Sequence, residues 1–335
     1  MITVSVCMIV KNESQILARC LDSLRGIWDE LIIVDTGSQD DTVTIARRYT
    51  DKVYSFEWTG DFSEARNFAL DKASCDYIYS ADADEILEGD NVDKFLALKR
   101  CLDPCIDVVQ MYYGNQLDNG TVYNFDRELR PKLFRRLKPI RFIEPIHETL
   151  NISPVVFDSD IEITHKPTSQ HGSRDIATFK RLIAEGTILS ERLEHFFARE
   201  MYMQGTIQDL QECESYLNSV TVSEDRNTDE VLEACVLLTR LYRVTGKIPE
   251  MFDNAIKVVA MESCSEVCVE LGQYYYDIGK YTDAAVWFYN AYHECTPILS
   301  IHSGKEDAIG GLADTYEKMG DPDTAAEYRN LLNEE

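Results

Sequence analysis

Short apolar runs alternate with amphipathic segments along the first half of the chain. Residues 3–10, 30–35 and 77–81 are almost wholly apolar, and each run has the length of one buried strand. Between them, residues 14–25 and 62–73 carry apolar side chains at helical spacing. Strands that alternate with such helices indicate βαβ units and a largely parallel sheet covered on both faces. A shorter helix and strand are expected between the second and third runs, over residues 40–49 and 52–58.

Beyond about residue 180 the strand pattern gives way to Tyr, Leu, Ala and Gly at helical spacing. Four glycines mark an internal repeat with steps of 41, 33 and 41 residues: Gly205, Gly246, Gly279 and Gly320. The unit over residues 271–291 resembles the paired helices of a tetratricopeptide repeat. We therefore expect an α/β domain over residues 1–170 and an all-α repeat domain over residues 171–335.

Composition excludes several classes of protein. The chain of 335 residues has 33 basic and 59 acidic residues and a net charge of −26. This balance argues against a nucleic-acid binder and against docking on an anionic membrane. Charges interrupt every apolar run well before the ~20 residues of a membrane span, and the apolar start lacks the basic lead-in of a signal peptide. Ten cysteines without a C-x-x-C pair predict free thiols and a cytoplasmic protein.

An acidic motif follows the third apolar run. Asp82 and Asp84 stand one residue apart, directly after residues 77–81. Two carboxylates at a strand end can hold a hard divalent cation, which also bridges phosphates. The alternative is an acid-rich helix start, because Asp84 and Glu85 precede a predicted helix.

Three further motifs precede this one in the chain: Val10-Lys11-Asn12-Glu13, Val34-Asp35-Thr36-Gly37-Ser38-Gln39-Asp40-Asp41-Thr42 and Gly60-Asp61-Phe62-Ser63-Glu64-Ala65-Arg66-Asn67. With Ala81–Glu85, they resemble in kind and order the motifs of family 2 glycosyltransferases, which use nucleotide sugars. The resemblance covers about residues 1–165. It implies a GT-A fold, which is Rossmann-like with a mostly parallel central sheet.

The resemblance also implies roles for individual residues. Asp82 and Asp84 would hold ribose and a Mg²⁺ or Mn²⁺ ion on the diphosphate. Asp35 ends a strand, where a carboxylate can accept hydrogen bonds from a base or ribose. The expected nucleotide-sugar contacts are Glu13, Asp35, Arg66, Asn67, Asp82, Arg135 and His147, and the expected metal ligands are Asp82, Asp84 and His165. For Arg66 the alternative is a surface salt bridge, and for His165 it is a structural role at a strand end.

A basic block stands out in this acidic chain. Seven cations fall within fifteen residues: Arg127, Arg130, Lys132, Arg135, Arg136, Lys138 and Arg141. Guanidinium groups suit phosphate oxygens, so we expect the block to face the diphosphate. The alternative is a solvated edge strand protected by its charges.

A candidate catalytic base follows this block. His147 and Glu148 resemble the His-Glu pair of many family 2 enzymes, although Glu144-Pro145 stands where relatives often carry Gly. Family 2 members invert the sugar carbon, and an inverting transferase needs a carboxylate that takes the acceptor's proton. Glu148 is the first candidate and Glu144 the second.

The sequence thus predicts a soluble, metal-dependent, inverting glycosyltransferase that uses a nucleotide sugar, first of all a UDP-sugar. The repeat domain, with 14 basic and 30 acidic residues over 168–335, suggests a peptide or protein acceptor, as in the sublancin-type S-glycosyltransferases, or a homodimer interface. Alternatives are a saccharide acceptor, and a repeat scaffold whose front domain is inactive. The scaffold should have a broken metal motif, but Asp82 and Asp84 are intact. Nucleotidyl transfer would need a Gly-rich, basic loop where Lys11-Asn12-Glu13 stands.

Overall fold

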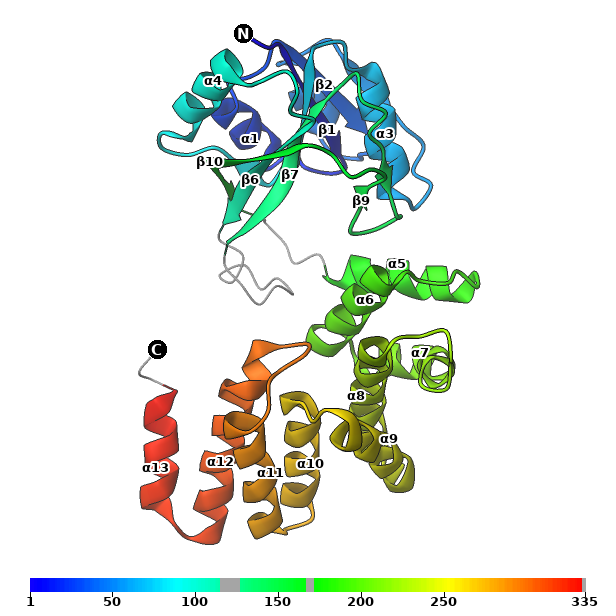
Figure 1. Cartoon of the computed structure of the whole chain (residues 1–335), viewed down its shortest axis with the longest axis vertical. Helices are drawn as coiled ribbons and strands as arrows, with labels where there is room; N and C mark the ends of the chain where they lie inside the picture. Colours follow the sequence, from blue (N-terminus) through cyan, green and yellow to red (C-terminus); the bar gives the residue numbers. More distant parts are fainter. Residues whose placement is uncertain (115–126, 167–171, 333–335) are drawn as a thin grey trace. The chain divides into compact units, whose positions relative to one another are not determined.

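The computed structural model describes residues 1–114, 127–166 and 172–332. The chain forms two compact units, Met1–Gln170 and His171–Glu335 (Figure 1). Among the helices of the described residues, none is long and apolar enough to cross a membrane.

The first unit is built on an eight-stranded sheet with the order β3-β2-β1-β4-β7-β6-β10-β5. The strands are β1 Val4–Val10, β2 Glu30–Asp35, β3 Val53–Ser55, β4 Tyr77–Ala81, β5 Glu85–Ile86, β6 Val108–Gly114, β7 Glu128–Arg135 and β10 Val156–His165. Strands β7 and β5 run antiparallel to the other strands. A separate hairpin joins β8 Phe142–Ile143 to β9 Thr149–Leu150. The mostly parallel α/β sheet expected from the sequence is confirmed.

Helices cover both faces of this sheet (Figure 1). They are α1 Leu17–Ser23, α2 Thr42–Ala46, α3 Phe62–Lys72 and α4 Asn91–Cys101. On one face, Leu21 of α1 and Phe95 of α4 share a buried core with Met8. On the other face, Ala69 and Leu70 of α3 pack with apolar residues of β1, β2 and β4. Because both faces are buried, strands β1, β2 and β4 are apolar almost throughout, which is why they were recognisable in the sequence.

The register brings three loops to one edge of the sheet. Val10 pairs with Asp35, and Met8 pairs with Ala81, so β1, β2 and β4 end almost level with one another. The segments that follow these strands therefore meet at this edge, which we call the carboxyl edge. Ligands of open α/β sheets bind beyond such an edge.

The second unit consists of helices: α5 Gly172–Ala184, α6 Glu191–Met203, α7 Ile207–Val220, α8 Thr228–Thr245, α9 Ile248–Met261, α10 Ser265–Asp277, α11 Tyr281–His293, α12 Glu306–Met319 and α13 Pro322–Leu331, with a 3₁₀ turn at Ile301–Gly304. Gly246, Gly279 and Gly320 have φ values of 75°, 75° and 82° just after α8, α10 and α12. Glycine takes this left-handed conformation at little cost, so each one ends the first helix of a pair. This confirms the helical repeat, and the 3₁₀ turn between α11 and α12 accounts for one of the long steps.

Candidate active site

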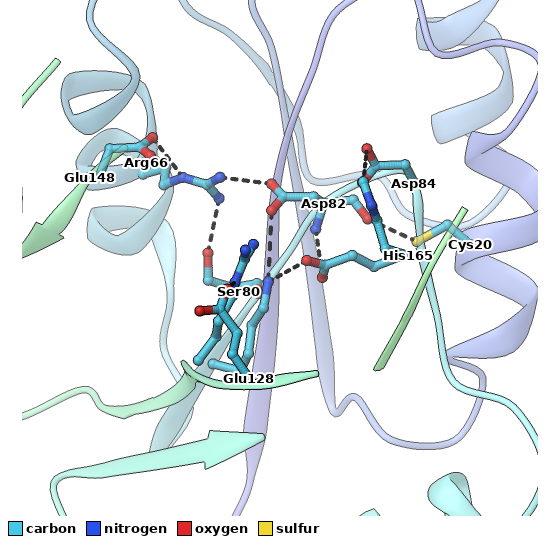
Figure 2. A network of polar contacts seen from close by, with 11 residues as sticks. Cys20, Arg66, Ser80, Asp82, Asp84, Glu128, Glu148 and His165 are labelled. Carbon is cyan, nitrogen blue, oxygen red and sulfur yellow. Dashed lines mark hydrogen bonds and ion pairs between the residues drawn. The ribbon is translucent and has the colours of Figure 1, made fainter. Parts of the chain in front are cut away.

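Arg66 lies at the centre of a polar network at the carboxyl edge (Figure 2). Its guanidinium donates to Asp82 Oδ1 at 2.8 Å, to Glu148 Oε1 at 3.0 Å and to Ser80 Oγ at 3.2 Å. The Arg66 side chain is only 16% exposed, so a surface salt bridge does not describe it. Although burial opposes its charge, the carboxylates of Asp82 and Glu148 raise the pKa of Arg66.

The first turn of α3 is tied down close to Arg66. Asp61 caps the helix by accepting from the backbone N–H of Glu64 at 3.2 Å. The N–H of Phe62 donates to the carbonyl of Pro145 at 2.9 Å, which joins this turn to the loop that leads to Glu148. The sequence therefore places Arg66 one turn into a capped helix.

Asn67 holds the hairpin that leads to Glu148. Its amide nitrogen donates to the carbonyl of Phe142 at 2.9 Å, and its amide oxygen accepts from the N–H of the same residue at 3.0 Å. This paired contact fixes the start of β8 against α3. Asn67 therefore has a structural contact at each end of its amide, and the nucleotide contact expected of it stays a prediction.

The loop between β8 and β9 carries the candidate base. Glu144 and His147 have φ values of 74° and 49°, in the left-handed region that favours glycine. Such strained conformations persist only where the surroundings hold them, and they cluster at functional sites. Pro145 is held through its carbonyl and Ile146 is buried, so the loop is anchored between the two strained residues. Of the two candidate carboxylates, Glu148 is the one that contacts Arg66.

Asp84 and His165 come together at the end of the acidic motif. His165 Nε2 lies 3.2 Å from Asp84 Oδ2, and Asp82 precedes this pair on the same turn (Figure 2). Pairing of β10 with β5 sets His165 opposite Glu85, and the N–H of Lys166 donates to the carbonyl of Asp84 at 2.8 Å. Of the three residues expected to hold a metal, Asp84 and His165 are therefore in contact, and Asp82 stands two residues before Asp84 on the same turn.

Two charged residues, Glu85 at this turn and Lys132 of β7 beside it, were not among the site residues expected from the sequence. Glu85 is 1% exposed and pairs with Lys132, which is itself buried. Burial, with help from Asp82 and Asp84, raises the pKa of Glu85 to about 7 even though Lys132 works in the other direction. Glu85 belongs to the acidic motif and Lys132 to the basic block. Their place in these two motifs is the sequence feature that could have pointed to them.

Asp82 stays ionised despite its surroundings. Burial would raise its pKa, but Arg66 and then Lys132 outweigh burial and hold the pKa below its usual range. Lys132 Nζ lies 3.7 Å from Asp82 Oδ2, on the other oxygen from the one that Arg66 contacts.

The loops after β1 and β2 lie beside this network. Asp35 is buried and accepts hydrogen bonds from the N–H groups of Gly37 and Ser38, each at 3.2 Å. Gly37 has a φ of 101°, which permits the tight turn. The backbone N–H of Glu13 donates to Thr42 Oγ1 at 2.7 Å, which joins the two loops. Glu13 and Asp35 therefore share the carboxyl edge with Asp82, Glu13 after the neighbouring strand β1 and Asp35 at the end of β2, two strands away.

Arg135 does not belong to this site. It pairs in register with Tyr77, at the start of β4, whereas Asp82 follows the end of that strand. Its closest carboxylate is Asp107, at 3.7 Å. Strand β7 has eight residues and spans roughly 25 Å, so cations at its two ends cannot share one ligand. The expectation that the whole basic block faces the diphosphate is therefore wrong for Arg135, Arg136, Lys138 and Arg141.

Comparison with known proteins agrees with this architecture. Residues 5–154 match the family described as Glycosyl transferase family 2. The glycosyltransferase SunS, derived from the SPbeta prophage of Bacillus subtilis, is 33% identical over 149 residues, which cover 44% of this chain and 34% of SunS. A TPR repeat-containing protein of Synechococcus elongatus is 39% identical over 153 residues, 46% of this chain and 36% of that protein. The match thus spans about a third of the length of these two relatives.

A further relative and two solved structures complete the comparison. A glycosyltransferase of Rickettsia prowazekii is 30% identical over 184 residues, 49% of this chain and 56% of that protein. Glucosyl-3-phosphoglycerate synthase from Mycobacterium tuberculosis, solved with Mn²⁺ and UDP-glucose, aligns with a TM-score of 0.41 at 16% identity over 56% of this chain and 81% of that one. Residues 1–349 of S. aureus TarS align with a TM-score of 0.36 at 14% identity over 75% of this chain and 88% of that one. At such scores the structural alignments carry no argument. Residues 5–154 match the family 2 glycosyltransferase domain, and they form the mostly parallel α/β sheet expected for the GT-A fold, followed by a helical region.

Proposed function

We propose that this protein transfers a sugar from a nucleotide sugar, in the first place a UDP-sugar, to an acceptor with inversion at the sugar carbon. The observation that carries the proposal is the bridge through Arg66. It joins Asp82 of the acidic motif to Glu148, the candidate base, although 66 residues separate the two in the sequence. An inverting transferase needs these two functions within one sugar of each other.

The donor would bind along the carboxyl edge. Asp35, already held by two backbone N–H groups, can accept further hydrogen bonds from a base or ribose through its carboxylate lone pairs. Asp82 follows β4, two strands from Asp35 with β1 between them, and can accept from the ribose hydroxyls. In this proposal the diphosphate would lie beside the turn that carries Asp84.

The residues at this turn suit a divalent cation. Two carboxylates separated by one residue, with an imidazole 3.2 Å from the second, form a donor set that Mn²⁺ accepts and that Mg²⁺ accepts through its oxygens. Asp82 is already neutralised by Arg66 and Lys132, so Asp84 and His165 are the principal ligands in this proposal. Such an ion would offset the negative charge that develops on the departing diphosphate.

Glu148 would act as the general base. Its carboxylate takes the proton of the acceptor hydroxyl or thiol while the acceptor atom bonds to the sugar carbon and the bond to the diphosphate breaks. Arg66 holds one oxygen of Glu148, so the carboxylate has a fixed orientation. A base that is held in one orientation speeds the reaction, because the entropy of positioning it is lost before the reaction begins.

The acceptor we propose is a peptide or protein. Helical repeats offer extended surfaces suited to polypeptides, and residues 168–335 carry a net charge of −16 that would attract a basic one. A cavity of about 300 Å³ in the second unit is lined by Glu191, Asp229 and Glu233, among others, and is a place to test this. A saccharide acceptor, or use of the repeat for dimerisation, is the alternative.

The donor assignment is tested by nucleotide-sugar hydrolysis and by thermal shift, with and without Mn²⁺. A ligand that binds the native state alone raises the unfolding temperature by mass action. We expect a metal-dependent shift with UDP and slow hydrolysis of a UDP-sugar, and D84N should weaken both strongly at the Mn²⁺ concentration that saturates the wild type. Full activity in EDTA would refute the metal assignment. No shift with any nucleoside diphosphate would favour the scaffold alternative.

The acceptor assignment is tested by charge reversal in the second unit. Glu191→Lys and Asp229→Lys change exposed acids in the first turns of α6 and α8, at the cavity. Asp283→Lys changes an exposed acid in the first turn of α11, away from the cavity, and serves as the matched control. We expect the first pair to raise the KM for a basic acceptor peptide while donor hydrolysis stays unchanged. Loss of a dimer with unaltered acceptor kinetics would assign the repeat to assembly instead.

A further inference from the structure

Lys132 occupies an irregular position in the sheet. Val109 of β6 pairs with Leu133 of β7, but the next residue of β6, Gln110, pairs with Pro131. Lys132 is therefore the extra residue of a β-bulge. Bulges re-aim a side chain and are common beside active sites. Here the bulge turns a lysine into the protein, where only 6% of it stays exposed.

The buried ammonium group of Lys132 faces the acidic motif. It pairs with Glu85, lies 3.7 Å from Asp82 Oδ2 and lies 3.5 Å from the carbonyl of Ser80. The ring of Tyr113 lies 5.4 Å away, at a distance where its face attracts a cation. Asp82 is thus held between two cations from different elements, with Arg66 of α3 on one oxygen and Lys132 of β7 on the other.

We propose that Lys132 is a positioning residue for the donor, which sets the orientation of the Asp82 carboxylate and so the affinity for a nucleoside diphosphate. This inference rests on the proposed function. Asp82, Asp84 and Glu85 place three carboxylates within four residues, and like charges this close repel. A cation between Asp82 and Glu85 lets both remain in place. Without Lys132, the Asp82 carboxylate keeps its contact with Arg66 on one oxygen but loses the cation on the other, so its orientation is no longer fixed.

A purely structural role predicts a different outcome. If Lys132 is buried only for stability, replacing it together with its partner should cost little stability. The reason is that removing both charges also removes the cost of burying them. A lysine that orients Asp82 cannot be replaced in this way, because Asp82 still lacks its second cation. The two roles therefore separate in a variant in which Lys132 and Glu85 are both neutral.

The experiment measures UDP affinity by calorimetry at saturating Mn²⁺, and KM and kcat for UDP-sugar hydrolysis, in K132M and K132M/E85Q. We expect both variants to lose UDP affinity by about 10–100-fold, the range typical of residues that support a ligand-binding shell. The KM for the donor should rise in proportion while kcat falls less than about threefold. The double variant should recover most of the unfolding temperature that K132M loses, yet keep the weak UDP binding.

Lys99→Met is the matched control. Lys99 is also buried and pairs with Asp29 at 2.7 Å, but it lies on α4, and Asp29 contacts the start of β1. The Lys99→Met variant should have a lower free energy of unfolding and an unchanged affinity for UDP. Wild-type affinity in folded K132M/E85Q would overturn the inference and leave the proposed function standing. A wild-type protein that binds no nucleoside diphosphate would overturn both.

Discussion

The Nε of Arg66 donates to Glu148 at 3.0 Å, and the same guanidinium contacts Asp82 at 2.8 Å. One side chain thus orients both the candidate base and the first carboxylate of the acidic motif. Because Arg66 is held in turn by a capped helix and the Asn67 hairpin contact, this geometry exists before any donor binds. Preorganisation of this kind removes part of the entropic cost of reaching the transition state.

The role of Glu148 can be tested with an isosteric change. Glu148→Gln keeps an oxygen for Arg66 but cannot take a proton, so turnover should fall by about 10²–10⁴. Donor affinity, measured by calorimetry with UDP, should stay close to wild type. Glu144→Gln is the comparison, since Glu144 lies in the same loop but shows no ion pair to Arg66 among the described contacts. Equal losses in the two variants would move the base away from Glu148.

Metal binding should depend on the contact between Asp84 and His165. Asp84→Asn and His165→Ala each remove one ligand and should raise the Mn²⁺ concentration for half-maximal hydrolysis by about 10–100-fold. Isothermal titration with Mn²⁺ in the presence of UDP measures the same effect without turnover. Asp90→Asn, an exposed acid beyond the acidic motif, should leave it unchanged. A normal Mn²⁺ dependence in H165A would confine His165 to a structural role.

Arg66 should matter for stability as well as for catalysis. Removing one partner of a buried ion pair leaves the other charge uncompensated, so Arg66→Met should lower the free energy of unfolding by about 2–4 kcal/mol in urea titrations. This expected loss of stability is at the lower end of the range for buried ion pairs, because the side chain of Asp82 is 32% exposed. Arg25→Met is the control: Arg25 pairs with Asp22 on the surface, where solvent screens the two charges, so its loss should change stability far less.

The effect of Arg66 should also depend on pH with a definite sign. The pKa of Asp82 is lowered in the folded protein, so its contribution to stability is present above the pKa of about 3.9 that an unfolded Asp has. That contribution is lost as the pH falls through the lower, folded value. The difference in stability between wild type and R66M should therefore shrink below about pH 4. A difference that grows on acidification would contradict the assigned pairing.

Local sequence signals predicted strands β1 to β4 and the site segments that border them. Strands β2 and β4 begin and end at the expected residues, because apolar residues buried on both faces leave an unbroken run. The carboxyl ends of these strands then locate Asp35, Asp82 and Asp84. The edge strand β3 is shorter than expected, because it pairs with β2 only from Val53 to Ser55.

Local sequence signals did not predict the strand register or the contacts between residues far apart in the chain. Whether Arg135 or Lys132 faces Asp82 depends on how β7 pairs with β4 and on one bulge in β7. The run of basic residues in the sequence predicts neither the pairing nor the bulge. The engagement of Asn67 with Phe142 likewise joins residues 75 positions apart. Such contacts are set by how elements pack, which a single sequence leaves open.

A buried acid in the second unit makes a separate prediction for alkaline pH. Burial raises the pKa of Glu194 to about 7, although Tyr216 and Arg226 both work against the rise. A raised folded pKa means that stability is fully present below the unfolded value near 4.3 and is lost as the pH rises through about 7. Glu194→Gln should abolish this loss, worth roughly 3 kcal/mol, while Gln still accepts from Tyr216. Unfolding temperatures at pH 5 and 8 should differ more in wild type than in E194Q.

Two adjacent glycines of α12 allow a close test of how the helical repeat packs. A Cβ on Gly311 would lie 2.4 Å from the ring of Phe288, which is buried on α11, whereas a Cβ on Gly310 would meet no heavy atom within 4 Å. Gly311→Ala should therefore lower stability by about 1–3 kcal/mol through overpacking. Gly310→Ala should raise it by up to ~1 kcal/mol, because Ala favours the helix over Gly. Urea unfolding of the two variants gives the comparison, and equal shifts of the same sign would show that Phe288 does not pack against α12 as described.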